Sequence, residues 1–124
     1  MCKGIGIDLC EISRMEKLLT NDRFLSRYFT SAEIAYVRGK GVSAAQTAAG
    51  MFAAREALAK ALGTGIDFDL REAEIAHDAA GQPRYALSGR LAERVGNDRL
   101  FLSISHDGGV AAAVCFIESG ATRA

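Results

Sequence analysis

The chain has 124 residues with 15 basic and 15 acidic side chains, and 49% of it is apolar, as in an ordinary globular domain. The net charge of zero excludes a global field that would attract nucleic acid or an anionic membrane. Three cysteines without Cys-x-x-Cys spacing argue against a disulfide framework or a zinc site. We therefore expect one cytoplasmic domain over residues 1–124, without signal peptide, membrane span or nucleic-acid partner.

An alternating pattern predicts a β-strand over residues 3–10. The two glycines on one face leave that face open to close approach by another group. Asp8 lies on the same face, and burying a carboxylate without a partner costs several kcal/mol, so we expect a cation beside it. One face carries Ile5, Ile7 and Leu9, and the other carries Gly4, Gly6, Asp8 and Cys10.

Three patterns of Ser or Thr with Glu or Gln three residues later predict the starts of helices. They are SRME, TSAE and SAAQ, which begin at Ser13, Thr30 and Ser43. The third helix is long and runs to about Leu62, with Gly63 as its stop. Between the first two, RFLSRYF predicts a helical turn or two.

The second half of the chain is richer in predicted strands. FDLREAEIAH predicts a strand ending near His77, DAAGQPRYAL predicts a turn leading into a short strand, and Ser88 begins a short helix through Val95. RLFLSIS and VAAAVCFI flank HDGG and predict a hairpin, whose strands we expect at the centre of the sheet because both faces are apolar. The order β-α-α-α-β-β-α-β-β predicts an α+β fold with helices packed on an antiparallel-leaning sheet.

Candidate chemistry begins on the long helix, where Phe52, Glu56 and Lys60 share one stripe. The simplest interpretation of the last two is a solvated salt bridge. Asp8 and Glu56 together offer two carboxylates, however, which suit Mg²⁺, or alternatively Mn²⁺, with phosphates and water as the remaining ligands.

Two further stretches could bind phosphate. Gly63, Thr64 and Gly65 follow the long helix and offer backbone N–H groups, although a glycine there is also an ordinary helix stop. Ser105 and His106 are neighbours on a strand and point to opposite faces, so they do not form a nucleophile–base pair. We expect His106 either to bind an anion or to bond to the backbone.

Basic residues outnumber acidic ones six to three between Ile12 and Lys40, which predicts a docking surface for an acidic partner. The basic residues of this segment are Arg14, Lys17, Arg23, Arg27, Arg38 and Lys40.

Three blocks of the chain resemble the holo-acyl-carrier-protein synthases, the small 4′-phosphopantetheinyl transferases of bacterial fatty-acid synthesis. The blocks are GIGIDLCEISRM, FAAREALAKALGTGI and LSISHDGGVAAAV, in this order, and the resemblance covers nearly the whole chain. It implies the 4′-phosphopantetheinyl transferase fold. It also implies transfer of phosphopantetheine from coenzyme A to a serine of apo acyl carrier protein, with release of adenosine 3′,5′-bisphosphate.

The resemblance also implies roles for individual residues. Asp8 and Glu56 would be Mg²⁺ ligands, Lys60 would hold the pyrophosphate, and either Glu56 or a metal-bound water would accept the serine proton. Contacts to the nucleotide would come from Gly63, Thr64, Gly65, Ser105 and His106 at its phosphates and from Pro83 near the adenine. The carrier protein would dock on Arg14, Lys17, Arg23, Phe24 and Arg27, with Met15 nearby.

Members of the family commonly form trimers with active sites between subunits, which the resemblance also implies here. Two positions depart from the pattern of the family. The chain has Arg55 where the family usually has Lys, and Met51 where a basic residue is frequent. Two other interpretations stay open: a non-catalytic module that binds carrier protein or nucleotide, and a different metal-dependent phosphate enzyme.

Overall fold

The structure, a computed structural model, describes residues 1–120. Its strands form a three-stranded antiparallel sheet in the order β1-β5-β4 and a separate antiparallel pair, β2-β3. The strands are β1 (Cys2–Glu11), β2 (Ala73–His77), β3 (Pro83–Leu87), β4 (Arg99–Asp107) and β5 (Val110–Glu118). The helices are α1 (Ile12–Leu18), α2 (Asp22–Tyr28), α3 (Ser31–Arg38), α4 (Ala44–Leu62) and α5 (Gly89–Val95), with short 3₁₀ helices η1 (Gly41–Ser43) and η2 (Leu70–Glu72).

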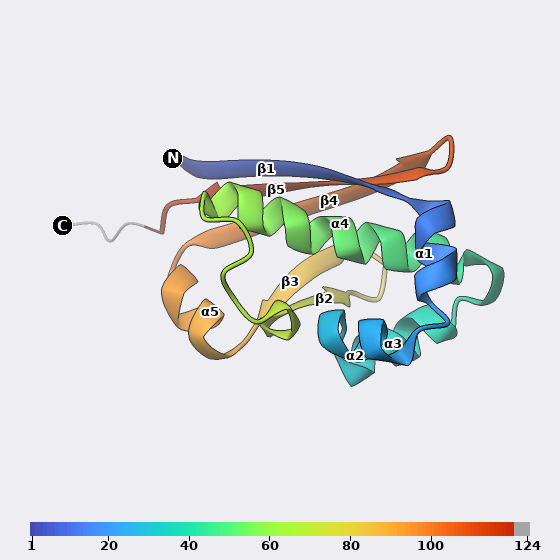
Figure 1. Cartoon of the computed structure of the whole chain (residues 1–124). Helices are drawn as coiled ribbons and strands as arrows, with labels where there is room; N and C mark the ends of the chain where they lie inside the picture. The colour runs from blue at the N-terminus through green and yellow to red at the C-terminus, as the bar shows by residue number, and fades with distance from the viewer. Residues whose placement is uncertain (121–124) are drawn as a thin grey trace.

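Helix α4 is the centre of the molecule. It runs along the inner face of the three-stranded sheet, with the α2 and α3 helices on its other side, while β3 contacts the edge strand β4 directly (Figure 1). Strand β1 approaches the helix backbone itself, because a Cβ atom on Gly4 or Gly6 would collide with the carbonyl oxygen of Ala61 or Ala57. The open glycine face predicted for this strand is therefore the face that packs on α4.

Several predicted ends of elements are confirmed. Thr30 and Glu33 form the capping box of α3, with both reciprocal bonds present. Gly63 ends α4 in the left-handed region at φ 79°. The β4-β5 hairpin turns at Gly108 and Gly109, both at positive φ, as a two-residue hairpin requires.

Other local predictions are wrong. Helix α1 begins at Ile12, directly after β1, so Ser13 lies inside the helix and does not cap it. The Ser43 side chain does not cap α4, because the 3₁₀ turn η1 leads into that helix. The strand ending at His77 starts only at Ala73, since η2 precedes it.

The α+β class is confirmed, and the structure refines its arrangement. RFLSRYF belongs to a complete helix, α2, in which the Asn21 side chain accepts a hydrogen bond from the Phe24 N–H at 3.1 Å. Only β5 is central, whereas β4 lies at the edge of the sheet. The prediction that both hairpin strands are central is therefore wrong for β4, whose outward side chains are left uncovered.

The outer face of the three-stranded sheet is apolar and open. Ile5, Ile7 and Leu9 of β1 are 64%, 61% and 66% exposed, and Phe101 of β4 is also exposed on this face. Phe101 packs edge-on against Phe116 of β5 at a ring distance of 6.1 Å. A contiguous exposed patch of large apolar side chains is typical of an interaction surface.

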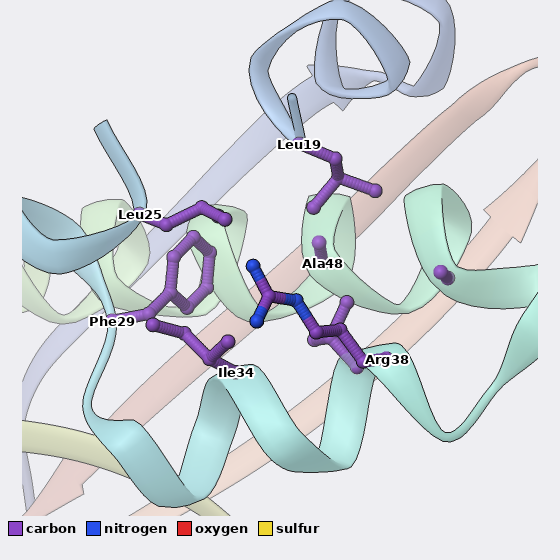
Figure 2. Close-up of a pocket in the computed structure, with 8 residues that line it drawn as sticks. Leu19, Leu25, Phe29, Ile34, Arg38 and Ala48 are labelled. Atoms are coloured by element: carbon purple, nitrogen blue, oxygen red, sulfur yellow. The ribbon is translucent and has the colours of Figure 1, made fainter. Parts of the chain in front are cut away.

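On the other side of α4, the helical layer encloses a small apolar pocket. Figure 2 shows Phe29 and Leu25 on one side of this pocket, Ala48 of α4 at its floor, and Arg38 reaching across it from α3. Apart from Arg38, the lining is apolar, so the pocket is part of the packing between these helices. Among residues 1–120, no helix combines the length and the hydropathy needed to cross a membrane.

Candidate active site

Asp8 and Lys60 meet where β1 crosses the last turns of α4. The Lys60 ammonium lies 3.2 Å from Asp8 Oδ1 and donates a hydrogen bond to the Ile7 carbonyl at 3.0 Å. The Asp8 side chain is 18% exposed, so a cation is in contact with a carboxylate that is largely withdrawn from water. In this structure Lys60 supplies a cation beside Asp8, whereas the sequence suggested a metal ion in that role.

Glu56 lies one helical turn before Lys60 and completes the group. Burial raises the pKa of Glu56, the neighbouring Asp8 carboxylate raises it further, and Lys60 and Arg14 act in the opposite direction. The two carboxylates are thus close enough to repel each other, although they come from elements far apart in sequence. We call Asp8, Glu56 and Lys60 the acidic cluster.

The donor set of the acidic cluster fits a hard divalent cation. Two carboxylates that repel each other at a partly buried site gain from a shared positive ion. Within residues 1–120, no group of three or more His, Cys, Asp or Glu side chains forms a metal-binding cluster. A pair of carboxylates suits Mg²⁺, which takes one or two protein carboxylates and completes its shell with water and substrate phosphates.

His106 lies in a second pocket, near the start of α4. The Gln46 amide nitrogen lies 2.9 Å from His106 Nε2, where it donates a hydrogen bond to the ring. Pro83 and His77 line the same pocket, and the His77 ring stacks on Tyr36 at 4.2 Å. Ser105 pairs with Ala112 and is exposed, on the opposite side of β4 from His106, as alternation along a strand predicts.

The glycine turn and the His106 pocket lie at opposite ends of α4. Gly63 ends this helix, whereas Gln46 is in its first turn, and 19 residues at ~1.5 Å each make the helix about 28 Å long. One chain therefore does not bring together Gly63, Thr64 and Gly65 with His106 and Pro83. The Thr64 hydroxyl is also engaged locally, because it accepts a hydrogen bond from Arg94 at 2.8 Å and contacts Asp67 at 3.2 Å.

A basic and aromatic surface adjoins the acidic cluster. Phe24 stacks on Tyr28 at 4.7 Å and lies 6.1 Å from Phe52, which is one turn before Glu56 on α4. The Arg14 guanidinium lies over the Phe52 ring at 5.9 Å. Arg27 lies over Tyr28, also at 5.9 Å, while Lys17 and Arg23 are exposed on α1 and α2.

Met15 does not belong to this surface. Its side chain is fully buried in the core and presents no surface to a docked partner. The helical period explains the difference, because Met15 points inward while its neighbours Arg14 and Glu16 point to solvent.

Comparison with known proteins identifies the architecture. A family model described as the 4′-phosphopantetheinyl transferase superfamily matches residues 4–115. A holo-[acyl-carrier-protein] synthase of Treponema denticola is 40% identical over 122 residues, covering 95% of this chain and 99% of that protein. The chain belongs to the holo-[acyl-carrier-protein] synthase family of 4′-phosphopantetheinyl transferases.

Solved structures of the holo-[acyl-carrier-protein] synthases share this fold. The Neisseria meningitidis protein has a TM-score of 0.85 at 32% identity, with 96% of this chain and 100% of that chain covered. The Bacillus anthracis protein, solved in complex with CoA (3′,5′-ADP), has a TM-score of 0.81 at 38% identity, with 96% and 98% covered. The chain is therefore an enzyme of the phosphopantetheinyl transferase class.

Sequence reasoning missed the role of Arg55 in this synthase fold. Arg55 is fully buried, pairs with the equally buried Glu33 and donates a hydrogen bond to the Leu70 carbonyl at 2.9 Å. Met51, at the other departure from the family pattern, is also buried and lines the His106 pocket. The capping box had already assigned Glu33 a local role, so no signal in the sequence indicated its second partner.

Proposed function

We propose that the chain transfers 4′-phosphopantetheine from coenzyme A to a serine of apo acyl carrier protein, with Mg²⁺ required and adenosine 3′,5′-bisphosphate released. The observation that carries this proposal is the convergence of Asp8, Glu56 and Lys60 at the crossing of β1 and α4. Two carboxylates and one ammonium in a partly buried site suit a substrate that brings a diphosphate and a divalent ion. Relatives named for this activity support it.

Asp8 and Glu56 would hold the metal ion. When bound, Mg²⁺, or Mn²⁺ in its place, would offset negative charge on the diphosphate as the phosphoryl bond breaks. Lys60 reaches the same region from α4, and its ammonium would bind a phosphate oxygen of coenzyme A.

The proton of the attacking serine must pass to a base at the acidic cluster. Glu56 is the candidate that the chain itself supplies, because burial and Asp8 raise its pKa above the ordinary value of a glutamate and so make its carboxylate more basic. The serine oxygen forms the new bond to phosphorus, and adenosine 3′,5′-bisphosphate departs with the electrons of the broken phosphorus–oxygen bond.

The nucleotide would bind through the two ends of α4. His106 and Pro83 lie in one pocket, while Gly63, Thr64 and Gly65 form the turn at the far end. Ser105 would add a contact from the outer face of β4. Because the Thr64 hydroxyl donates its hydrogen to Asp67, the backbone N–H groups of this turn are its better phosphate donors.

The proposed nucleotide contacts at the two ends of α4 are too far apart to meet within one chain. This separation supports a homotrimer whose active sites lie between subunits. The open face formed by Ile5, Ile7, Leu9 and Phe101 is the surface that neighbouring copies would cover. One transferase domain over residues 1–124 and a cytoplasmic location complete the proposal. The three cysteines are unpaired, which suits a reducing compartment.

The acyl carrier protein would dock on the basic and aromatic surface beside Glu56. Arg14, Lys17, Arg23 and Arg27 supply charge that would steer an acidic partner, and Phe24 supplies an apolar contact. Holo carrier protein formed in this way would serve fatty-acid synthesis.

Incubation with coenzyme A, Mg²⁺ and several bacterial apo acyl carrier proteins tests the proposal by mass spectrometry. We expect a gain of one phosphopantetheine on the carrier protein, abolished by EDTA and restored by Mg²⁺. Binding of coenzyme A without any such gain would refute the transferase proposal and indicate a non-catalytic module. Release of inorganic phosphate would indicate a different phosphate enzyme.

A further inference from the structure

A buried ion pair is attached to α4 at the residue that precedes Glu56. The Arg55 and Glu33 side chains are each 1% exposed. Arg55 Nη2 donates a hydrogen bond to Glu33 Oε1, and the guanidinium lies 5.1 Å from the centre of the Phe29 ring. Arg55 immediately precedes Glu56, but neither Arg55 nor Glu33 is exposed to a substrate.

The Glu33 carboxylate accepts hydrogen bonds from groups at the start of α3, on β2 and on α4. The Thr30 N–H donates to it at 2.9 Å and the Ile75 N–H at 2.8 Å. These bonds hold the start of α3 and the free edge of β2. Through Arg55, which also bonds to the Leu70 carbonyl, the same carboxylate fixes the middle of α4 to η2.

A directional contact can fix the rotation of α4 about its axis, because most of the side chains that α4 buries are small. Most of its buried positions are alanine or glycine, which interdigitate weakly and leave the rotation of a helix about its axis poorly determined. Successive residues on a helix are about 100° apart, so a rotation of Arg55 about the axis turns Glu56 by the same angle. Polar pairs in a core are known to fix register in this way in some proteins.

We propose that the Arg55–Glu33 ion pair is a positioning device that sets the rotation of α4 and so directs Glu56 and Lys60 towards Asp8. This inference rests on the proposed function only for its catalytic readout. The ion pair acts through α4 and touches no reacting group.

Four proteins test this: wild type, Glu33→Gln/Arg55→Met, Arg55→Lys and Leu91→Ala. The double variant removes both charges, and the lysine variant keeps the charge without the planar fork. Leu91→Ala lowers stability from a buried position on α5 and leaves the Arg55–Glu33 pair intact. Circular dichroism and urea unfolding establish folding and stability. The readouts are kcat, the KM for coenzyme A, and Mn²⁺ affinity by electron paramagnetic resonance without substrates.

We expect the folded double variant to lose about tenfold to a hundredfold in kcat, since small misplacements of catalytic groups have effects of this size. Its Mn²⁺ affinity should fall, with Arg55→Lys intermediate in both readouts. Leu91→Ala should keep kcat and Mn²⁺ affinity within about twofold of wild type despite its lower stability. Values for the double variant equal to those of Leu91→Ala would overturn the inference.

If the double variant does not fold, the Arg55→Lys variant tests the positioning role instead. A kcat reduced about threefold or more with a native spectrum supports positioning, and an unchanged kcat overturns it. A wild-type chain that transfers nothing would refute the proposed function instead. The Mn²⁺ affinities of the variants would then still test the ion pair.

Discussion

Asp8 shows how a carboxylate is kept on a strand face that packs against a helix. Glycines at positions 4 and 6 bring the strand onto α4, and Lys60 then supplies the charge that Asp8 needs. Glu56 forms no ion pair among the described residues, and burial together with Asp8 raises its pKa against the opposing effect of Lys60 and Arg14. The cluster is therefore electrostatically suited to one more cation.

We expect Asp8→Asn and Glu56→Gln each to lower transfer activity by a factor of about a thousand or more, because each removes one of two charged donors. Glu56→Gln should be at least as stable as wild type, since the ionised side chain is desolvated and lies near Asp8. Turnover assays and thermal unfolding measure both effects. Glu93→Gln, an exposed acid on α5, is the control, and unfolding of both variants would make these acids structural instead.

His77 gives a prediction for the dependence of stability on pH. Burial and the nearby Lys40 ammonium lower the pKa of His77 below its ordinary value of 6.5. The unfolded chain therefore binds a proton while the folded His77 is still neutral, so the free energy of unfolding falls as the pH drops through about 6.5. His77→Gln should reduce this fall in urea unfolding compared at about pH 7.5 and about pH 5.5. An equal fall in wild type and variant would contradict it.

At the scale of elements, the contact between β1 and α4 is made by backbone. A Cβ atom at position 6 would strike the Ala57 carbonyl, and the helix can yield only by moving away from the strand. This contact sets the distance between the sheet and the helix that carries Glu56 and Lys60.

We expect Gly6→Ala to lower the free energy of unfolding by about 2 kcal/mol or more, as overpacking does, and to lower activity because Asp8 is displaced. Gly39→Ala is the matched control, since the nearest atoms to its added Cβ would lie 3.5 Å away and its φ is −70°. Urea unfolding should leave the control within about 0.5 kcal/mol of wild type. Equal stability of the two variants would show that β1 can move away without loss.

Local patterns in the sequence predicted the elements well where neighbouring residues determine them. Thr30 and Glu33 define the start of α3, Gly63 defines the end of α4, and the paired glycines define the last hairpin. Contacts between distant segments were not predictable. Leu91 N–H of α5 donates to Glu72 at 3.1 Å, although Ser88 is the cap that the sequence suggests.

The residues of the candidate site could be singled out from the sequence, but their partners in space could not. Alternation on β1 and the helical stripe on α4 singled out Asp8, Glu56 and Lys60, because each side chain departs from the apolar or small residues around it. The partnership of Arg55 with Glu33 was hidden, since it depends on how α3 packs against α4. Separation of the glycine turn from His106 was hidden as well, because it depends on the length of α4 in space.

At the scale of the whole molecule, two features would have one explanation: the exposed outer face of the sheet, and the separation of the proposed nucleotide contacts along α4. In the proposed assembly, the exposed Ile5, Ile7 and Leu9 would be covered, and the proposed nucleotide contacts at the two ends of α4 would need a second chain to meet. Association through this face would answer both requirements.

We therefore expect Ile7→Glu to convert an oligomer into monomers and to lower transfer activity by about tenfold or more, because a charge on an apolar interface is costly to bury. Light scattering after size-exclusion chromatography measures the mass. Val42→Glu, at a fully exposed position outside the sheet, should change neither mass nor activity. A wild-type monomer with full activity would contradict the assembly.

The uncovered sheet face also has a kinetic consequence. If neighbours complete each other's nucleotide contacts, turnover per molecule falls on dilution, and total activity rises with more than the first power of enzyme concentration. Cells could then regulate modification of the carrier protein simply through the abundance of this chain. Coenzyme A, by bridging two copies, would shift the midpoint of that dilution curve to lower concentration.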